Sequence, residues 1–257
     1  NGQLSKFVTN IDVEIQQSNI YSSQLLSDDS IALGSISNGI FILSKEGKLV
    51  YHITQNSGLS NNTALSLFED VDKNLWIGLD NGINCINLNS PIKSYSDNTG
   101  ILGTIYTSIT FGNKLYIGTN QGLFCKELNS TSKFEFVQNT KGQVWNLFSY
   151  QNTLFCGHDS GTFIVNNTNA NLIYGASGTW KFVPYSEGSN FILQGNYNGV
   201  SVLEKKNNSW VFRNKIKGFN YSSKHFEILN KKEIYVSHEY KGVYRFNIDD
   251  KLNLASN

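Results

Sequence analysis

One strand-turn-strand phrase recurs six times along this chain and constrains its fold more than any other feature. In each copy an apolar strand ends at a small or polar residue, a short polar turn follows, and a glycine opens the next strand. The phrases span residues 31–43, 75–86, 115–125, 154–165, 191–203 and 234–246. Their turn glycines are Gly39, Gly82, Gly122, Gly161, Gly199 and Gly242, at intervals of 43, 40, 39, 38 and 43 residues. This spacing is typical of four-stranded propeller blades.

A further short apolar strand precedes each phrase and another follows it, so each unit contains four strands. Such units cannot bury both of their faces alone, and radial stacking solves this. The sequence therefore predicts an all-β fold, a β-propeller of about six blades that forms a single domain over residues 1–257. The blades are expected at about 20–54, 62–96, 105–138, 143–174, 180–213 and 221–257. A β-solenoid would need shorter repeats, and a sandwich would not repeat its sequence.

The N-terminal segment is a candidate for closing the ring. Residues 5–24 align without gaps on residues 90–109, which are expected to hold an outer strand, a loop and the next inner strand. Residues 1–10 would then supply the outer strand of the last blade and hide its open edge. Two alternatives remain at this point: the tail after Phe246 forms its own outer strand from Leu252 onward, or the chain is part of a larger ring.

Composition excludes several classes of protein. Charged residues make up 16% of the chain, the net charge is +1, and no basic stripe alternates with aromatic residues, so we expect no nucleic-acid partner. No apolar run is long enough for a membrane span, and we expect no membrane contact by this stretch of chain. Three cysteines cannot form a fully paired framework and are interpreted as small buried side chains.

One stretch also resembles a known family. Residues 58–83, GLSNNTALSLFEDVDKNLWIGLDNGI, are similar to the two-component regulator propeller repeat, and residues 115–123, LYIGTNQGL, are a second good match. Lys73, Leu79 and Ile83 depart from the usual Gly, Thr and Leu of that repeat. The other four units are more degenerate copies.

The resemblance implies a periplasmic or extracellular ligand-binding sensor propeller, of the kind found in Bacteroidetes-type two-component regulators. Many such modules sense glycan fragments, and typical members carry additional domains beyond the propeller. The resemblance therefore implies a non-catalytic sensor with a carbohydrate or other small ligand. The first alternative is an exported scaffold propeller that binds a protein partner. The second is a polysaccharide lyase or hydrolase.

No catalytic, cofactor or metal motif stands out in the sequence. The four histidines form no close ligand pair, and residues 69–72 (EDVD) lack the spacing and the glycine of an EF-hand. Nucleophile-elbow, phosphate-loop and dinucleotide patterns are absent in their required contexts. We therefore expect no metal, no cofactor and no enzymatic activity. An enzyme would need two carboxylates, or a histidine and a tyrosine, at the channel mouth.

The geometry of propellers indicates where a ligand would bind. Loops between second and third strands meet the starts of inner strands on one face, and aromatic rings flanked by polar groups suit sugars. Tyr106 and Trp145 begin inner strands there, whereas Trp76, Trp180 and Trp210 are interpreted as packing residues. The candidate ligand-binding residues are Asp80, Asn120, Trp145, His158, Asp159, Tyr197, Glu239 and Tyr240.

Overall fold

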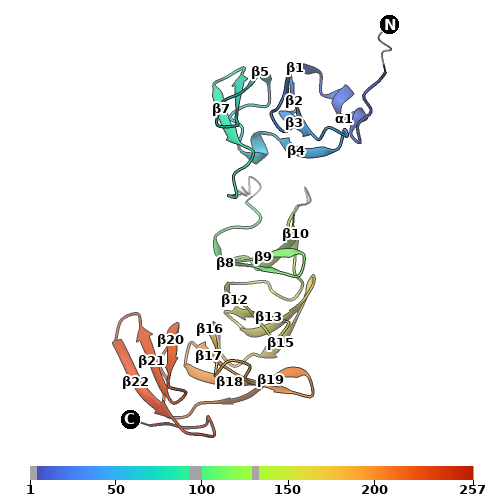
Figure 1. Cartoon of the computed structure of the whole chain (residues 1–257). Coiled ribbons are helices and arrows are strands. Elements are labelled where there is room, and N and C mark those ends of the chain that lie inside the picture. The colour runs from blue at the N-terminus through green and yellow to red at the C-terminus, as the bar shows by residue number, and fades with distance from the viewer. Residues whose placement is uncertain (1–4, 93–99, 129–132, 257) are drawn as a thin grey trace. The chain divides into compact units, whose positions relative to one another are not determined.

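The computed structural model describes residues 5–92, 100–128 and 133–256, and the chain divides into two compact units, Asn1–Asn98 and Thr99–Asn257. Antiparallel sheets build both units, and the described residues contain one short α-helix and one 3₁₀ turn (Figure 1). The predicted all-β fold of repeating sheets is confirmed. The arrangement of all blades in one ring stays a prediction.

The first unit contains two sheets. Its elements are α1 (Asp12–Gln17), β1 (Ile20–Leu25), β2 (Ile31–Ser35), β3 (Ile40–Leu43), β4 (Leu49–Ile53), η1 (Gln55–Ser57), β5 (Ala64–Glu69), β6 (Asn74–Leu79) and β7 (Ile83–Asn87). One sheet has the order β1-β2-β3-β4, and the other has the order β5-β6-β7. The end of the blade predicted at 62–96 falls partly on residues 93–96, outside the described residues.

The second unit contains four four-stranded sheets. The first sheet contains β8 (Ile105–Phe111), β9 (Lys114–Thr119), β10 (Leu123–Glu127) and β11 (Glu135–Phe136), and the second contains β12 (Val144–Tyr150), β13 (Thr153–His158), β14 (Gly161–Asn166) and β15 (Asn169–Tyr174). The third contains β16 (Thr179–Pro184), β17 (Phe191–Asn196), β18 (Gly199–Lys206) and β19 (Ser209–Lys215). The fourth contains β20 (His225–Leu229), β21 (Glu233–His238), β22 (Gly242–Ile248) and β23 (Ala255–Ser256). The first strands of successive sheets, β8, β12, β16 and β20, lie next to one another. The sheets therefore stack face to face, as blades do.

Two glycine positions in the repeated phrase have different physical roles. The turn glycines all have positive φ, from 69° at Gly39 to 150° at Gly122, so they occupy backbone conformations that disfavour a side chain. The glycine at the end of the second strand instead permits close packing of sheets. A Cβ on Gly195 would lie 2.0 Å from the Ser223 carbonyl oxygen of the next sheet, and one on Gly157 would lie 2.7 Å from that of Thr179. The phrase thus encodes both the turn and the spacing between blades.

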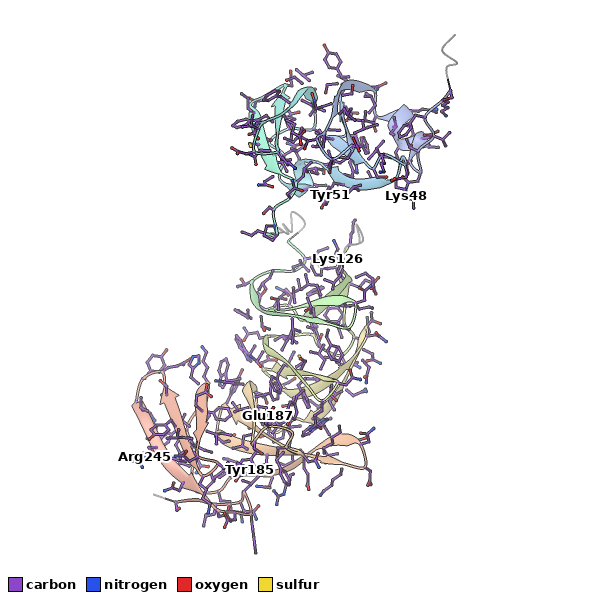
Figure 2. All side chains as sticks on the ribbon, in the orientation of Figure 1. Lys48, Tyr51, Lys126, Tyr185, Glu187 and Arg245 are labelled. Carbon is purple, nitrogen blue, oxygen red and sulfur yellow. The ribbon has the colours of Figure 1, made fainter. Side chains whose placement is uncertain are left out.

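Apolar side chains fill the space between neighbouring sheets within each unit (Figure 2). Leu154 and Val144 are fully buried between β8–β11 and β12–β15, and Leu193 and Ile234 between the last two sheets. Cys125 and Cys156 belong to this core, as predicted. Cys85 on β7 does not: it is exposed, because it alternates with Ile86 and faces away from the core of its sheet.

The N-terminal segment covers a face of the first sheet. Residues 5–10 form no strand; the Asn10 N–H donates to the Gly47 carbonyl oxygen at 3.1 Å, and the Asn10 side chain accepts from the Leu49 N–H at 2.8 Å. Helix α1 follows, and Ile11 at its N-cap and Ile15 within it lie against a cluster that includes Phe41 and Leu43. The i, i+4 spacing of the two isoleucines puts them on one side of the helix.

The outer strand of the last sheet, as the structure describes it, comes from the C-terminal tail, an alternative that the sequence left open; closure of the ring by residues 1–10 stays a prediction. Ala255 and Ser256 pair with Ile248 and Asn247 of β22. The Asp249 carboxylate turns the tail back by accepting from the Asn253 and Leu254 N–H groups, and Leu252 is buried in the core beside β22. A short, capped turn and one buried leucine thus make the tail sufficient to complete the sheet. Arg245 lies on β22 and pairs with Glu233 of the adjacent strand (Figure 2).

Candidate ligand-binding site

A β-bulge near the start of the inner strands β8, β12 and β16 gives the candidate site its local structure. The register of the first strand shifts between Ile105 and Thr107, between Val144 and Asn146, and between Thr179 and Lys181. The residue inside each bulge is unpaired, and bulges commonly redirect a side chain in this way. The bulged residues are Tyr106, Trp145 and Trp180. By register Lys224, directly before β20, holds the corresponding position in the last sheet.

These side chains form a row across the second unit, which we call the aromatic row: Tyr106, Trp145, Trp180 and Tyr197. Ring centroids are 4.9 Å apart for Tyr106 and Trp145, 4.7 Å for Trp145 and Trp180, and 4.8 Å for Trp180 and Tyr197, all tilted by about 40°. The Lys224 Nζ lies 4.9 Å from the centroid of Trp180. The tyrosines at both ends are exposed, Tyr106 to 43% and Tyr197 to 38%.

Hydrogen bonds fix the orientation of the rings. The Trp145 Nε1 donates to the Tyr197 hydroxyl at 2.8 Å, and the Trp180 Nε1 donates to the Ser222 Oγ at 3.2 Å. Burial raises the pKa of Tyr197 and the charge of Asp159 adds to this, although the hydrogen bond from Trp145 opposes it. The Tyr197 hydroxyl therefore stays protonated and can donate to a ligand. The row offers apolar rings beside the oriented Tyr197 hydroxyl, a combination that suits sugar rings.

A buried polar network fixes the backbone next to Tyr197. The Asn196 Nδ2 donates to the Gly178 carbonyl oxygen at 3.2 Å and to the Thr179 Oγ1 at 2.8 Å. The Thr179 hydroxyl lies 2.9 Å from that of Thr162, which donates to the Gln194 Oε1 at 2.7 Å. The network joins β14, β16 and β17 and holds the loop before β16 against Tyr197. A Cβ on Gly178 would lie 2.4 Å from the Cζ of Tyr197, so only glycine leaves room for the ring.

His158 and Asp159 lie at the turn between β13 and β14. The His158 ring is buried, its Nε2 lies 3.3 Å from the Thr140 carbonyl oxygen, and its Nδ1 accepts from the Ser160 N–H at 3.0 Å. The Asp159 Oδ1 lies 2.5 Å from the same Nδ1. Burial lowers the pKa of His158 more than the Asp159 charge raises it, so the histidine is neutral. It supports the turn, whereas Asp159 is half exposed beside Tyr197.

The structure places the other predicted residues in four different settings. The Asn120 side chain accepts from the Thr104 N–H at 2.8 Å and so caps its own loop. Glu239 forms an ion pair with Lys224 at 2.9 Å. Tyr240 is 88% exposed and its N–H donates to the His238 Nδ1. Asp80 lies in the first unit, where its N–H donates to the Thr63 carbonyl oxygen.

The structure therefore brings Trp145, Asp159 and Tyr197 together. Glu239 reaches the aromatic row only indirectly, because it pairs with Lys224, which lies over the Trp180 ring. Trp180, interpreted from the sequence as a packing residue, packs on Trp145 and Tyr197 in the middle of the aromatic row. Lys224 was not singled out from the sequence at all. Aligning the inner-strand starts would have found both residues, since they share one register with Tyr106 and Trp145. Trp210 does pack, being buried against Phe155, and Trp76 is exposed on β6.

Within the part of the chain that the structure describes, no three histidine, cysteine or acidic side chains gather in a way that could hold a metal ion. The same residues include no helix long and apolar enough to cross a membrane.

Comparison with known proteins supports the family resemblance. Residues 58–81 match the family model described as "Two component regulator propeller". The resemblance stated from the sequence is confirmed over this stretch, so the chain carries a two-component regulator propeller repeat. A search among curated proteins finds no match.

Solved structures include similar folds. The extracellular domain of BT3049 from B. thetaiotaomicron, named as part of a hybrid two component system, is 21% identical with a TM-score of 0.61; the match covers 97% of this chain and 36% of that one. The extracellular domain of BT4673 from the same organism is 15% identical with a TM-score of 0.47, over 93% of this chain and 37% of that one. This chain thus spans little more than a third of the length of these relatives. The likeness to BT3049 supports the propeller fold.

Proposed function

We propose that this chain is a non-catalytic ligand-binding propeller of a periplasmic or extracellular sensor, part of a two-component-type regulator, and that its ligand is a glycan fragment. The aromatic row carries this proposal. It joins four rings from three consecutive sheets, exposes a tyrosine at each end, and orients the Tyr197 hydroxyl through its hydrogen bond with Trp145. Two observations support the regulatory context: the two-component regulator propeller repeat in residues 58–81, and a fold shared with the extracellular domain of BT3049.

The site favours binding over catalysis. His158, the one histidine among the predicted residues, is buried and neutral, and both of its ring nitrogens lie within hydrogen-bond distance of neighbouring groups of the protein. Of the predicted carboxylates on this unit, Asp159 is held beside His158 and Glu239 is paired with Lys224. A general acid and base must be free to reach the substrate. The same arrangement serves a binding site well, because the polar groups are already oriented.

The test is a glycan array followed by titration calorimetry with each saccharide that binds. Trp145→Ala and Tyr197→Ala are expected to weaken binding about tenfold or more, since each removes a ring of the row and their shared hydrogen bond. Trp76→Ala is the matched control, because Trp76 is a 43% exposed tryptophan outside the row and is expected to leave affinity unchanged.

Three results would contradict the proposal. Absence of saccharide binding together with capture of a specific protein would favour the scaffold function. Shortening or unsaturation of a bound saccharide, detected by mass spectrometry, would establish an enzyme. Equal affinity of the Trp145→Ala, Tyr197→Ala and wild-type proteins would place the site elsewhere.

A further inference from the structure

The last sheet adds positive charge to the end of the aromatic row. The Lys224 Nζ lies 4.9 Å from the centroid of the Trp180 ring, and the Lys241 Nζ lies 4.7 Å from that of Tyr221. The two lysines come from different loops, 216–224 and 239–241, at the same end of this sheet. Contacts within a few ångströms of an aromatic face hold an ammonium group in place while leaving it hydrated.

Few carboxylates balance this charge. Loops 216–224 and 239–241 contain three lysines and a single acidic residue, Glu239. Glu239 pairs with Lys224, and no carboxylate of the described residues lies within ion-pair distance of Lys241. The Asp159 carboxylate adds a negative charge beside Tyr197, so the side of the row next to Lys241 is the part that attracts anions.

The ion pair between Lys224 and Glu239 is easily exchanged. The side chains of Lys224 and Glu239 are both 40% exposed, and ion pairs with that exposure contribute only about 0–1 kcal/mol. An incoming carboxylate can replace Glu239 as the partner of Lys224 with little loss. The Lys224 ammonium would stay above Trp180, so the ligand would be drawn to the aromatic row.

From this arrangement we infer that the ligand is an acidic saccharide, one bearing uronic acid residues, whose carboxylate pairs with Lys224 and Lys241. Its sugar ring packs on the exposed tyrosines that lie beside them, Tyr197 next to Trp180 and Tyr221 beneath Lys241. The inference rests on the proposed glycan-binding function and names the chemical class of its ligand.

The test compares matched saccharides by titration calorimetry. The probes are trimers of galacturonate, glucuronate and mannuronate, each beside its carboxyl-reduced counterpart, which keeps the ring and linkage but lacks the charge. At least one uronate trimer is expected to bind about tenfold or more tightly than its reduced counterpart, because hydrogen bonds to charged groups are stronger than neutral ones. Binding should weaken as sodium chloride is raised from 50 to 500 mM, since salt screens exposed charges.

Lys224→Gln and Lys241→Gln are each expected to lower affinity for the uronate trimer about five- to tenfold and to leave affinity for the reduced trimer unchanged. Lys251→Gln, in the turn between β22 and β23, is the control and should bind as the wild type does. Circular dichroism confirms that each variant is folded.

The outcomes separate this inference from the proposed function. Equal binding of uronate and reduced trimers, still dependent on Trp145, would overturn the acidic ligand and leave a glycan sensor. Preference for uronates that survives both lysine substitutions would refute the assigned residues. Failure of every saccharide to bind would remove the inference together with the proposed function.

Discussion

Replacing Gly178 with alanine tests how the candidate site is held together. Gly178 lies in the loop before β16, where the Asn196 side chain binds its carbonyl oxygen and the Tyr197 ring covers its α-carbon. An added Cβ would lie 2.4 Å from the Tyr197 Cζ and 2.7 Å from the Asp159 carbonyl oxygen. Ordinary contacts begin near 3.4 Å, so the ring would have to move by about 1 Å.

The magnitude follows from two costs. Overpacking a well-filled site costs about 1–3 kcal/mol. A shift of Tyr197 also breaks its 2.8 Å hydrogen bond with Trp145, a loss of about 0.5–1.5 kcal/mol. At about 2–4 °C of Tm per kcal/mol for a unit of this size, Gly178→Ala should lower the Tm by about 3–18 °C. Saccharide affinity should fall as well, because both aromatic side chains lose their positions.

Gly175→Ala is the matched control in the same loop. Its added methyl group would lie 3.0 and 3.8 Å from the Cδ2 and Cγ of Leu172, an exposed and flexible side chain, and 3.9 Å from the Ser160 carbonyl oxygen, an ordinary contact distance. Both substitutions reduce the entropy of the unfolded chain equally, so the comparison isolates the contact with Tyr197. Thermal unfolding followed by tryptophan fluorescence measures the difference. A Gly178→Ala protein as stable as the Gly175→Ala protein, with unchanged ligand affinity, would refute the packing argument.

Two further predictions concern stability. Ile11→Ala should lower the free energy of unfolding of the first unit by about 2 kcal/mol or more, because Ile11 is 8% exposed and packs against Phe41 and Leu43. Urea denaturation measures this loss, with Val13→Ala at an exposed position in α1 as the control. Equal losses in the two variants would contradict the prediction. Burial lowers the pKa of His158 from its usual 6.5, so the unfolded state binds a proton at this histidine more readily than the folded state does. Relative to acidic pH, the fold is therefore favoured where His158 is neutral in both states. This contribution to stability is fully present above pH 6.5 and is lost as the pH falls through the folded-state pKa. The Tm of the wild type should therefore fall from pH 7.5 to pH 5 more steeply than that of His158→Gln, and parallel curves would show that His158 does not contribute.

Much of the fold could be predicted because the repeated phrase fixes local structure. An apolar run, a polar turn and a glycine with positive φ define a hairpin wherever they occur, as at Gly82 and Gly242. The sequence left open whether the tail forms the outer strand of the last sheet, because this strand depends on one turn. The Asp249 carboxylate and the buried Leu252 redirect the tail, and neither belongs to the repeat.

The candidate site was only partly predictable. Trp145 and Tyr197 were proposed together because both stand at loop positions on one face, and the structure joins them by a hydrogen bond. Trp180 was assigned to packing because tryptophans usually pack, and Lys224 has no motif around it. Trp180 reaches the aromatic row because it lies inside the bulge of β16, and Lys224 lies over its ring from the position directly before β20. Neither contact can be read from a single sequence.

The sequence by itself determined the strands, the turns and the stacking of sheets, because these follow from short-range patterns of apolar residues and glycine. The tertiary structure alone decided which side chains meet. Side chains 52 residues apart, such as Trp145 and Tyr197, come into contact only when sheets stack closely enough for inner strands to lie side by side. Glycines without a side chain, such as Gly195 against Ser223, permit that approach. The repeat thus explains why the sheets stack, whereas the stacking explains why an aromatic row exists at all.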